Sequence, residues 1–280
     1  MEYKTLNNGV VMPRLGYGVY LISQEECERC VLDAISVGYR AIDTAQAYGN
    51  EEGVGAAISK CGISRGELFI TSKIWINNSG VKKAEESINL SLKKLKTDYI
   101  DLMLVHQPFG DYYGTYRAME KAVKQGKIRA IGISNFYGDR LADICLNFET
   151  TPAVNQVETH PLHMKKELHA VMDKYGVTHE SWAPLGQARN GLLTNPVICG
   201  VAEKHGKTAA QVALKYLLQN DIVVIPKSVH KERMAENFNV FDFTLDADDL
   251  AAIAELDDKK NTFFSHHTAF TAERLINLYK

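Results

Sequence analysis

The sequence has little of what marks membrane, secreted or nucleic-acid-binding proteins. No apolar stretch approaches the ~20 residues that a membrane-spanning helix needs. Residues 1–16 contain no apolar segment of the kind found in signal peptides. The 34 acidic and 32 basic residues are well mixed, so that no basic face is indicated. We therefore expect a cytoplasmic protein whose partners include neither membranes nor nucleic acids.

Cysteine is too scarce and too scattered for a disulfide framework. The five cysteines, at positions 27, 30, 61, 145 and 199, are odd in number and indicate reduced thiols. Cys27 and Cys30 have the C-x-x-C spacing of some redox and zinc sites, but the sequence offers no second pair of ligands. Residues 23–38 instead predict an amphipathic helix with Ser23 as its N-cap and Gly38 as its stop. We favour two helical cysteines and expect no metal.

Linkers, internal repeats and low-complexity segments are also lacking, so we expect one domain over residues 1–280. Apolar strand-like runs alternate with amphipathic helical patterns, such as those at 79–96 and 207–220. This alternation predicts a parallel sheet built from βαβ units. The predicted strands are 16–20, 39–43, 68–73, 100–106, 128–135, 153–158, 178–184 and 222–228.

A doubly wound sheet and a closed barrel are both compatible with eight such units. A dinucleotide-binding doubly wound sheet would carry G-x-G-x-x-G after its first strand, and neither early glycine cluster has that spacing. Most strands instead end in polar residues, and the strand ends of a (β/α)8 barrel converge on one face. We therefore predict a (β/α)8 TIM barrel. Asn7-Asn8-Gly9 between short strand-like runs predicts a preceding β-hairpin.

Four of these polar residues make a chemically sensible group. Asp43, Tyr48, Lys73 and His106 come from the ends of strands two, three and four, which should lie side by side. Taken singly, each is more typical of a cap, a solvated charge or a core hydrogen bond. Together, the lysine would lower the tyrosine pKa below its usual ~10, the aspartate would hold the lysine, and the histidine would orient a substrate carbonyl.

Around these four residues and along essentially its whole length, the sequence resembles the aldo-keto reductases. Residues 41–51, "AIDTAQAYGNE", are similar to the family's D-T-A-x-x-Y-x-N-E stretch, and "ITSKIW" and "DLMLVHQP" to the segments that carry its lysine and histidine. The resemblance implies hydride transfer from NADPH to an aldehyde or ketone. It makes Asp43, Tyr48, Lys73 and His106 the catalytic tetrad, with Tyr48 as the proton donor.

Further motifs imply a cofactor site. "GISNF" and "VNQVETHP" resemble the segments that bind the nicotinamide carboxamide, here through Ser134, Asn135 and Gln156. "SWAPLG" resembles the segment whose aromatic residue, here Trp182, stacks on the nicotinamide ring. "IPKSVHKERMAENF" resembles the adenosine-phosphate site. The remaining residues that the resemblance assigns to the cofactor are Ala183, Leu185, Gln187, Lys227, Ser228, Val229, Arg233, Glu236 and Asn237.

The substrate pocket departs from that of many family members. Gln107 and Tyr20 stand where tryptophans are common, which resembles the bacterial branch with 2,5-diketo-gluconate and methylglyoxal reductases. We expect small polar carbonyl substrates, with Trp75 and Phe109 on the remaining wall, although Phe109 could equally be a packing residue. The tail with Phe263, Phe264, His266 and His267 corresponds to the C-terminal specificity loop. The resemblance favours a monomer and leaves open a slow, cofactor-binding regulatory protein.

Overall fold

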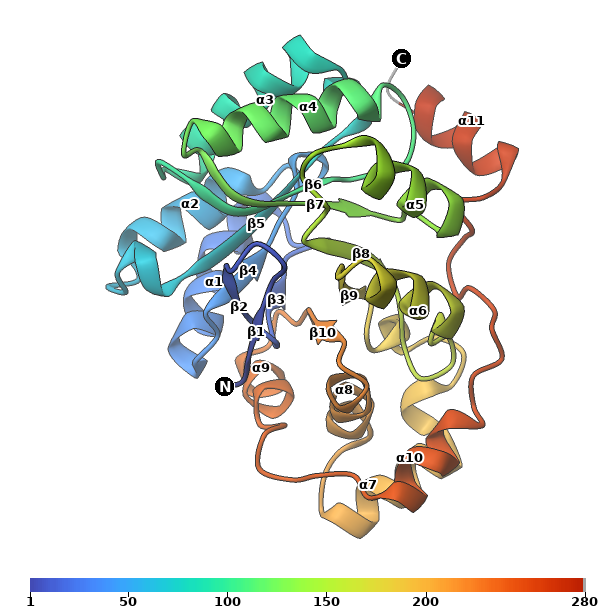
Figure 1. Ribbon diagram of the computed structural model, residues 1–280. Coiled ribbons are helices and arrows are strands. Elements are labelled where there is room, and N and C mark those ends of the chain that lie inside the picture. Colours follow the sequence, from blue (N-terminus) through green and yellow to red (C-terminus); the bar gives the residue numbers. More distant parts are fainter. Residues whose placement is uncertain (279–280) are drawn as a thin grey trace.

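The computed structural model describes residues 1–278, and a sheet of eight parallel strands forms its centre (Figure 1). Each strand is hydrogen-bonded to the strand that follows it in the chain, from β3 through to β10. The predicted strands are all present, although the first and the last contain only two residues each. They are β3 (Tyr17–Gly18), β4 (Ala41–Asp43), β5 (Phe69–Ile74), β6 (Ile100–Val105), β7 (Ile128–Ser134), β8 (Val154–Glu158), β9 (Thr178–Trp182) and β10 (Val223–Val224).

Hydrogen bonds between the last strand and the start of the first close this sheet into a barrel. Leu15 forms a parallel bridge with Val224, whose N–H donates to the Arg14 carbonyl at 3.0 Å. On the other side, the Gly16 N–H donates to the Val224 carbonyl at 2.8 Å. Closure leaves no free strand edge, and it confirms the predicted (β/α)8 barrel.

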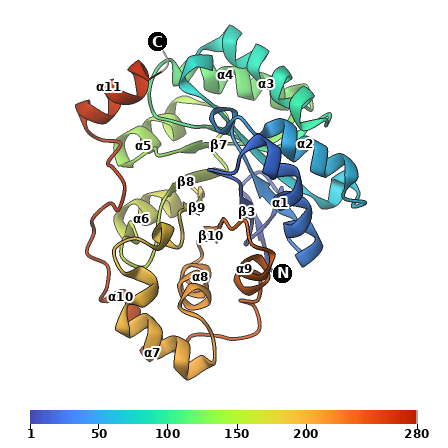
Figure 2. The ribbon, with the colours of Figure 1, turned by 180° about the vertical axis from the view of Figure 1, so that it is seen from behind.

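Helices follow the strands in alternation and surround the barrel in both views (Figures 1 and 2). Three additional helices, α7 (Pro196–His205), α10 (Ala247–Ala254) and α11 (Ala269–Asn277), extend the simple repeat. The alternating helices are α1 (Gln24–Val37), α2 (Glu51–Lys60), α3 (Val81–Leu95), α4 (Tyr112–Lys124), α5 (Gly138–Asn147), α6 (Lys166–Lys174), α8 (Ala209–Gln219) and α9 (Lys231–Phe238).

Helix α1 shows how the sequence sets an element's ends. Ser23 Oγ accepts a hydrogen bond from the Glu26 N–H at 3.3 Å, and Gly38 ends the helix with a φ of 127°. Cys27 and Cys30 are fully buried on its inner side as free thiols. Burial is the main cause that raises the pKa of Cys27 to about 12, so this thiol stays protonated. The interpretation of the pair as helical packing residues is confirmed.

The predicted hairpin, β1 (Tyr3–Thr5) and β2 (Val11–Pro13), covers one end of the barrel (Figure 1). Its Leu6 and Met12 are buried at 3% and 1% exposure. They pack against residues that begin the strands, including Ala41, Phe69 and Val154. This end is therefore filled by apolar side chains, and the opposite end, where the strands finish, is left for the polar residues.

After α10, the chain runs along the outside of the barrel past α6 and α5 to reach α11 (Figures 1 and 2). No helix within the described residues is both long and apolar enough to cross a membrane.

Candidate active site

One cavity of about 720 Å³ opens at the carboxyl ends of the strands. This volume falls within the range of ~300–1,000 Å³ that is typical of small-molecule sites. Most of the predicted site residues lie on its wall. They are Tyr20, Asp43, Tyr48, Trp75, His106, Gln107, Ser134, Asn135, Gln156, Trp182, Ala183, Leu185, Gln187 and Lys227.

Lys73 lies behind this wall and connects two of the residues that line it. Its ammonium is fully buried and donates to Asp43 Oδ1 at 2.5 Å, to the Thr44 carbonyl at 2.9 Å and to Tyr48 Oη at 3.3 Å. The three donors of the ammonium thus have three oxygen acceptors. Burial alone would lower the pKa of Lys73, but Asp43, Tyr48 and Glu180 together raise it above its ordinary value. The lysine remains charged.

The phenol of Tyr48 differs from the expectation in one respect. Burial raises its pKa to about 12, although Lys73 acts in the opposite direction. The prediction of a pKa below 10 is therefore wrong for this structure, because taking a phenolate out of water costs more than one neighbouring ammonium returns. Tyr48 is a protonated hydroxyl held beside a cation.

His106 follows β6 and its ring lies close to the phenol. The ring centroids of His106 and Tyr48 are 5.6 Å apart, and that of Trp75 is 4.9 Å from the imidazole. Burial, with Lys73 second, lowers the pKa of His106 well below its ordinary value. A neutral imidazole carries one N–H donor and one acceptor, so His106 can donate a hydrogen bond to an oxygen in the cavity.

Hydrogen bonds from two neighbouring residues fix the short 3₁₀ helix, Gln46–Tyr48, that carries the phenol. Gln46 Oε1 accepts from the Trp75 N–H at 3.1 Å and from Asn78 Nδ2 at 2.8 Å. The buried Asn50 donates to the carbonyls of Val19 and Ile22, both at 2.9 Å, and so holds the loop with Tyr20.

Ser134, Asn135 and Trp182 form a connected group on another part of the wall. Trp182 Nε1 donates to Asn135 Oδ1 at 2.9 Å, and Asn135 Nδ2 donates to Ser134 Oγ at 3.1 Å. Asn135 has a φ of 65°, a left-handed conformation that asparagine tolerates better than most residues. This turn at the end of β7 lets one amide face both its own strand and the indole of β9.

A buried glutamate that the sequence analysis did not single out completes the site. Glu180 lies on β9 in register with Gln156 on β8, and both side chains are almost fully buried. Gln156 Nε2 donates to Glu180 Oε2 and to Asp43 Oδ2, both at 2.8 Å. Burial, followed by Asp43, raises the pKa of Glu180 to about 8. The available signal was an acidic residue in the middle of the predicted strand 178–184.

The loop after β10 and the start of α9 carry the predicted phosphate-binding residues. Lys227 and Arg233 are exposed, and within residues 1–278 neither has a carboxylate within ion-pair distance. No side chain caps the first turn of α9. Glu236 Oε1 accepts a hydrogen bond from Thr208 Oγ1 at 2.7 Å. Ser228, Val229, Arg233, Glu236 and Asn237 do not line the cavity itself but lie on its β10 and α9 side.

Three of the four predicted substrate residues, Tyr20, Trp75 and Gln107, line the cavity, and Phe109 takes the packing role that the sequence had left open. The Tyr20 ring centroid is 5.0 Å from that of Tyr48. Phe109 does not line the cavity; it is buried, with the Arg140 guanidinium 5.4 Å from its ring centroid. Arg140 on α5 also donates to the Pro108 carbonyl at 3.1 Å, so the same guanidinium contacts both residues of this loop. Phe109 is therefore a packing residue.

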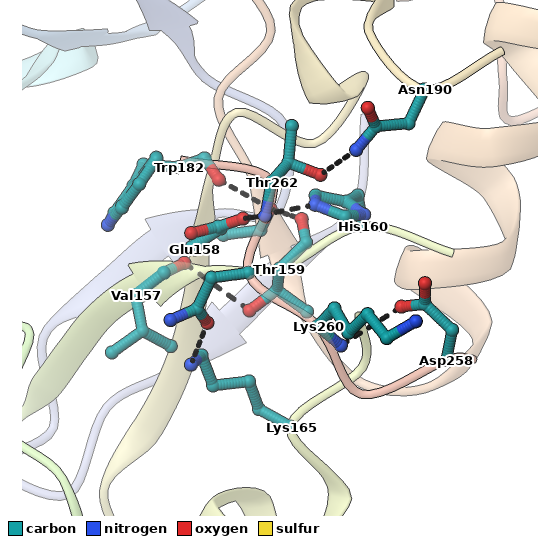
Figure 3. Close-up of polar contacts among 12 residues, drawn as sticks. Val157, Glu158, Thr159, His160, Lys165, Trp182, Asn190, Asp258, Lys260 and Thr262 are labelled. Atoms are coloured by element: carbon teal, nitrogen blue, oxygen red, sulfur yellow. Dashed lines mark hydrogen bonds and ion pairs between the residues drawn. The ribbon is translucent and has the colours of Figure 1, made fainter. Parts of the chain in front are cut away.

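The C-terminal segment contributes to the cavity wall. Hydrogen bonds hold it at several points (Figure 3). The Thr262 N–H donates to Glu158 Oε1 at 2.5 Å, and Asn190 Nδ2 donates to Thr262 Oγ1 at 3.0 Å. Lys165 Nζ donates to Asn261 Oδ1 at 3.1 Å. These bonds fix the segment just before Phe263, which lines the cavity with its ring centroid 5.3 Å from that of Trp182.

Phe264 and His266 also line the cavity, as expected for the tail. His266 is buried and its Nδ1 lies 3.3 Å from Tyr137 Oη, while the His267 ring packs on the Tyr137 ring at 4.6 Å. Among the described residues, no group of three or more His, Cys, Asp or Glu side chains is placed to hold a metal ion.

Comparisons with known proteins agree with this geometry. A model of the aldo/keto reductase family matches residues 14–258. The chain is 45% identical to methylglyoxal reductase DkgA from Escherichia coli over 91% of its own length and 93% of that protein. An aldo-keto reductase from a deep-sea metagenome superposes with a TM-score of 0.93 at 41% identity, over 95% of this chain and 99% of the other.

A Bombyx mori aldo-keto reductase, solved in complex with NADP, superposes with a TM-score of 0.89 at 31% identity and covers 94% of this chain and 95% of its own. The family match spans most of the chain, and the likeness extends over nearly the full length of each relative. The chain belongs to the aldo/keto reductase family.

Proposed function

We propose that this protein catalyses the NADPH-dependent reduction of small, polar aldehydes and ketones to alcohols, in a single barrel domain. The observation that carries the proposal is the Tyr48 hydroxyl, which lies 3.3 Å from the buried Lys73 ammonium on a cavity that neutral His106 also lines. This arrangement places one proton donor and one hydrogen-bond donor where a carbonyl oxygen could contact both. Family membership makes an oxidoreductase acting on carbonyl groups the expected activity.

The residues present fit NADP(H). Among the described residues, the cavity wall carries the cations Arg189, Lys227 and Arg274 and a single acid, Asp43, which is already paired with Lys73. Lys227 and Arg233 are exposed cations free for a 2′-phosphate, and the first turn of α9 adds uncapped backbone N–H groups. A cofactor carrying a 2′-phosphate suits this charge pattern better than one with free ribose hydroxyls.

Ser134, Asn135, Gln156 and Trp182 would hold the nicotinamide end. Trp182 is fixed by its hydrogen bond to Asn135, so its ring can serve as a stacking surface. Ala183, Leu185 and Gln187 continue the same wall from the end of β9. Ser228 and Val229 lie beside Lys227 in the loop, and Glu236 with the buried Asn237 would face the adenine.

The bound nicotinamide supplies the hydride, and the chain supplies position and a proton. His106 would donate a hydrogen bond to the substrate's carbonyl oxygen and orient it. Tyr48 Oη would give its proton to that oxygen as negative charge develops there. The phenolate left behind would be stabilised by the Lys73 ammonium, which Asp43 keeps in place.

The pocket wall favours small polar substrates. The cavity beside the tetrad is lined by Tyr20, Trp75 and Gln107. Gln107, the residue that follows His106 in the chain, adds an amide to this wall. One relative is a methylglyoxal reductase, whose named substrate is a small dicarbonyl. We further propose a cytoplasmic monomer; all five cysteines are free thiols, in keeping with a reducing compartment.

Loss of NADPH absorbance on adding methylglyoxal or 4-nitrobenzaldehyde to the purified protein tests this proposal. Turnover that exceeds the protein-free rate, with NADPH preferred to NADH, is the expected result. NADPH binding without turnover of any carbonyl would favour a slow regulatory protein of the same fold. Failure to bind either dinucleotide would contradict the proposed function altogether.

A further inference from the structure

Glu180 is an ionisable group beside the tetrad that the proposed mechanism does not use. It is fully buried in the middle of β9, and its Oε1 has no hydrogen-bond partner within the described residues. An unneeded carboxyl at such a position would be a substantial liability, because burying a polar group without full hydrogen bonding lowers stability. Its side-chain hydrogen bond with Gln156 therefore suggests what it does.

The amide group of Gln156 is held at both of its N–H bonds. One points to Asp43 Oδ2 and the other to Glu180 Oε2, each with a nitrogen–oxygen distance of 2.8 Å. Asp43 lies across the barrel on β4, whereas Glu180 is the in-register neighbour on β9. The amide is thus fixed from two directions, and rotating it by half a turn would bring its oxygen against both carboxyls.

This leaves Oε1 as the free polar atom of Gln156. It receives no hydrogen bond from any residue that the structure describes, and Gln156 lines the cavity. An amide oxygen accepts but cannot donate, so a ligand group opposite it must carry an N–H or O–H. The carboxamide of a nicotinamide offers such an N–H, on its NH₂ group.

We propose that Glu180 is a positioning residue for the nicotinamide: together with Asp43 it fixes the Gln156 amide so that Oε1 accepts from the NH₂ of the cofactor carboxamide. The inference rests on the proposed use of NADP(H). A carboxyl that is neutral fits the role, because the buried set of Lys73, Asp43 and Glu180 then carries no net charge. Glutamine is the amide counterpart of a neutral carboxyl and keeps an oxygen acceptor, whereas leucine has a similar size and no acceptor.

The test compares the dissociation constants of NADP⁺ and its 3-acetylpyridine analogue, in which a methyl group replaces the carboxamide NH₂. Calorimetric titration of the wild-type protein should show NADP⁺ binding about two- to tenfold more tightly, as expected for one neutral hydrogen bond. In Glu180→Leu the two ligands should bind within about twofold of each other, because one N–H of Gln156 is released and the amide can turn. Glu180→Gln should restore the wild-type preference.

The outcomes separate this inference from the proposed function. An unchanged preference for NADP⁺ in Glu180→Leu would overturn the positioning role. An equal loss of that preference in Glu180→Gln would overturn it too, because the role needs only the oxygen acceptor, which glutamine keeps. Failure of the wild-type protein to bind NADP⁺ at all would instead overturn the cofactor assignment. Arg117→Met, on the exposed face of α4 away from the cavity, is the matched control and should keep the wild-type preference. If Glu180→Leu does not fold, the wild-type and Glu180→Gln titrations keep the inference falsifiable, because a preference absent from either contradicts it.

Discussion

At the scale of single residues, burial and charge act in opposite directions on the Tyr48 phenol. Burial, the larger effect, raises the pKa of Tyr48 to about 12, and Lys73 works against it. The hydroxyl therefore stays protonated throughout the neutral range and is available as a donor. In the proposed mechanism, its acidity during turnover would depend on the Lys73 ammonium, which would stabilise the phenolate as the proton leaves.

The pKa of Glu180 predicts a pH-dependent stability. Burial is the main cause that raises its folded-state pKa from an ordinary 4.5 to about 8. Below a pH of about 4.5 the carboxyl is protonated in both the folded and the unfolded protein, so it contributes nothing to the pH dependence of stability. Between about 4.5 and 8 only the unfolded chain releases the proton, so the stability of the wild-type protein falls as pH rises. The melting temperature of Glu180→Gln should exceed that of the wild type by a margin that grows over this interval and then levels off.

Thermal unfolding followed by circular dichroism at a series of pH values measures that margin. The same margin at pH 4.5 and pH 8 would mean that Glu180 is ionised in the folded protein, which the prediction does not allow.

Residues at strand ends could be predicted from the sequence, and residues defined by their surroundings could not. Asp43 and Lys73 stand out because each closes an apolar run. The pKa of Tyr48 depends on how completely the neighbouring loops bury it, which no local pattern contains. Glu180 needed the register of β8 against β9 to acquire its partner.

At the scale of elements, the turn from β10 into α9 concentrates the charges proposed for the 2′-phosphate. Arg233 is exposed in the first turn of α9, and its guanidinium can bind a phosphate with two parallel hydrogen bonds. Arg233→Met should raise the Kd for NADPH roughly ten- to a hundredfold, because a charge-assisted hydrogen bond contributes about 1.5–3 kcal/mol.

The Kd for NADH should change much less, since NADH has no 2′-phosphate. Titrations of both dinucleotides with the same variant provide the comparison. Equal weakening of the two would show that Arg233 does not recognise the phosphate.

Alanine substitutions at two helical glycines distinguish the effect of close helix packing on stability from the effect of helix propensity. A Cβ on Gly55 in α2 would lie 2.2 Å from the Lys94 carbonyl oxygen on α3, whereas a Cβ on Gly200 in α7 would meet nothing within 4 Å. Gly55→Ala should therefore destabilise the protein by about 1–3 kcal/mol through overpacking. Gly200→Ala should stabilise it by about 0.5–1 kcal/mol, because alanine is the better helix former. Urea unfolding measures both, and a stabilising Gly55→Ala would contradict the close approach of α2 and α3.

Strands and helix ends of the barrel follow local rules and could be read from the sequence. The helix over 23–38 ends where Ser23 and Gly38 predict, since capping is a property of neighbouring residues. The packing of Phe109 was harder to predict, because its contact with Arg140 joins residues that lie 31 positions apart in the chain.

At the scale of the whole molecule, closure of the barrel assembles the site. Gln156 on β8 donates hydrogen bonds to two carboxyls from other strands. One belongs to Asp43 across the barrel on β4, and the other to Glu180 on the neighbouring β9. The alternation of strands and helices, together with the polar residues at the strand ends and the lack of a G-x-G-x-x-G motif, was enough to predict this closure. The course of the C-terminal segment was not, because it depends on contacts such as Glu158 with Thr262, 104 positions apart, which have no local signature (Figure 3).

The most direct measurement of the central claim is the turnover number of Tyr48→Phe with NADPH and methylglyoxal, beside the Kd of the variant for NADPH. The variant keeps the ring and loses only the hydroxyl next to Lys73. Because proton donation by a placed side chain contributes about 10²–10⁴-fold, kcat should fall by that factor while the Kd stays close to the wild-type value. Tyr3→Phe, an exposed tyrosine of the hairpin, is the control and should match the wild type in both. A wild-type kcat in Tyr48→Phe would contradict the assignment of Tyr48 as the proton donor, and with it the mechanism proposed for this barrel.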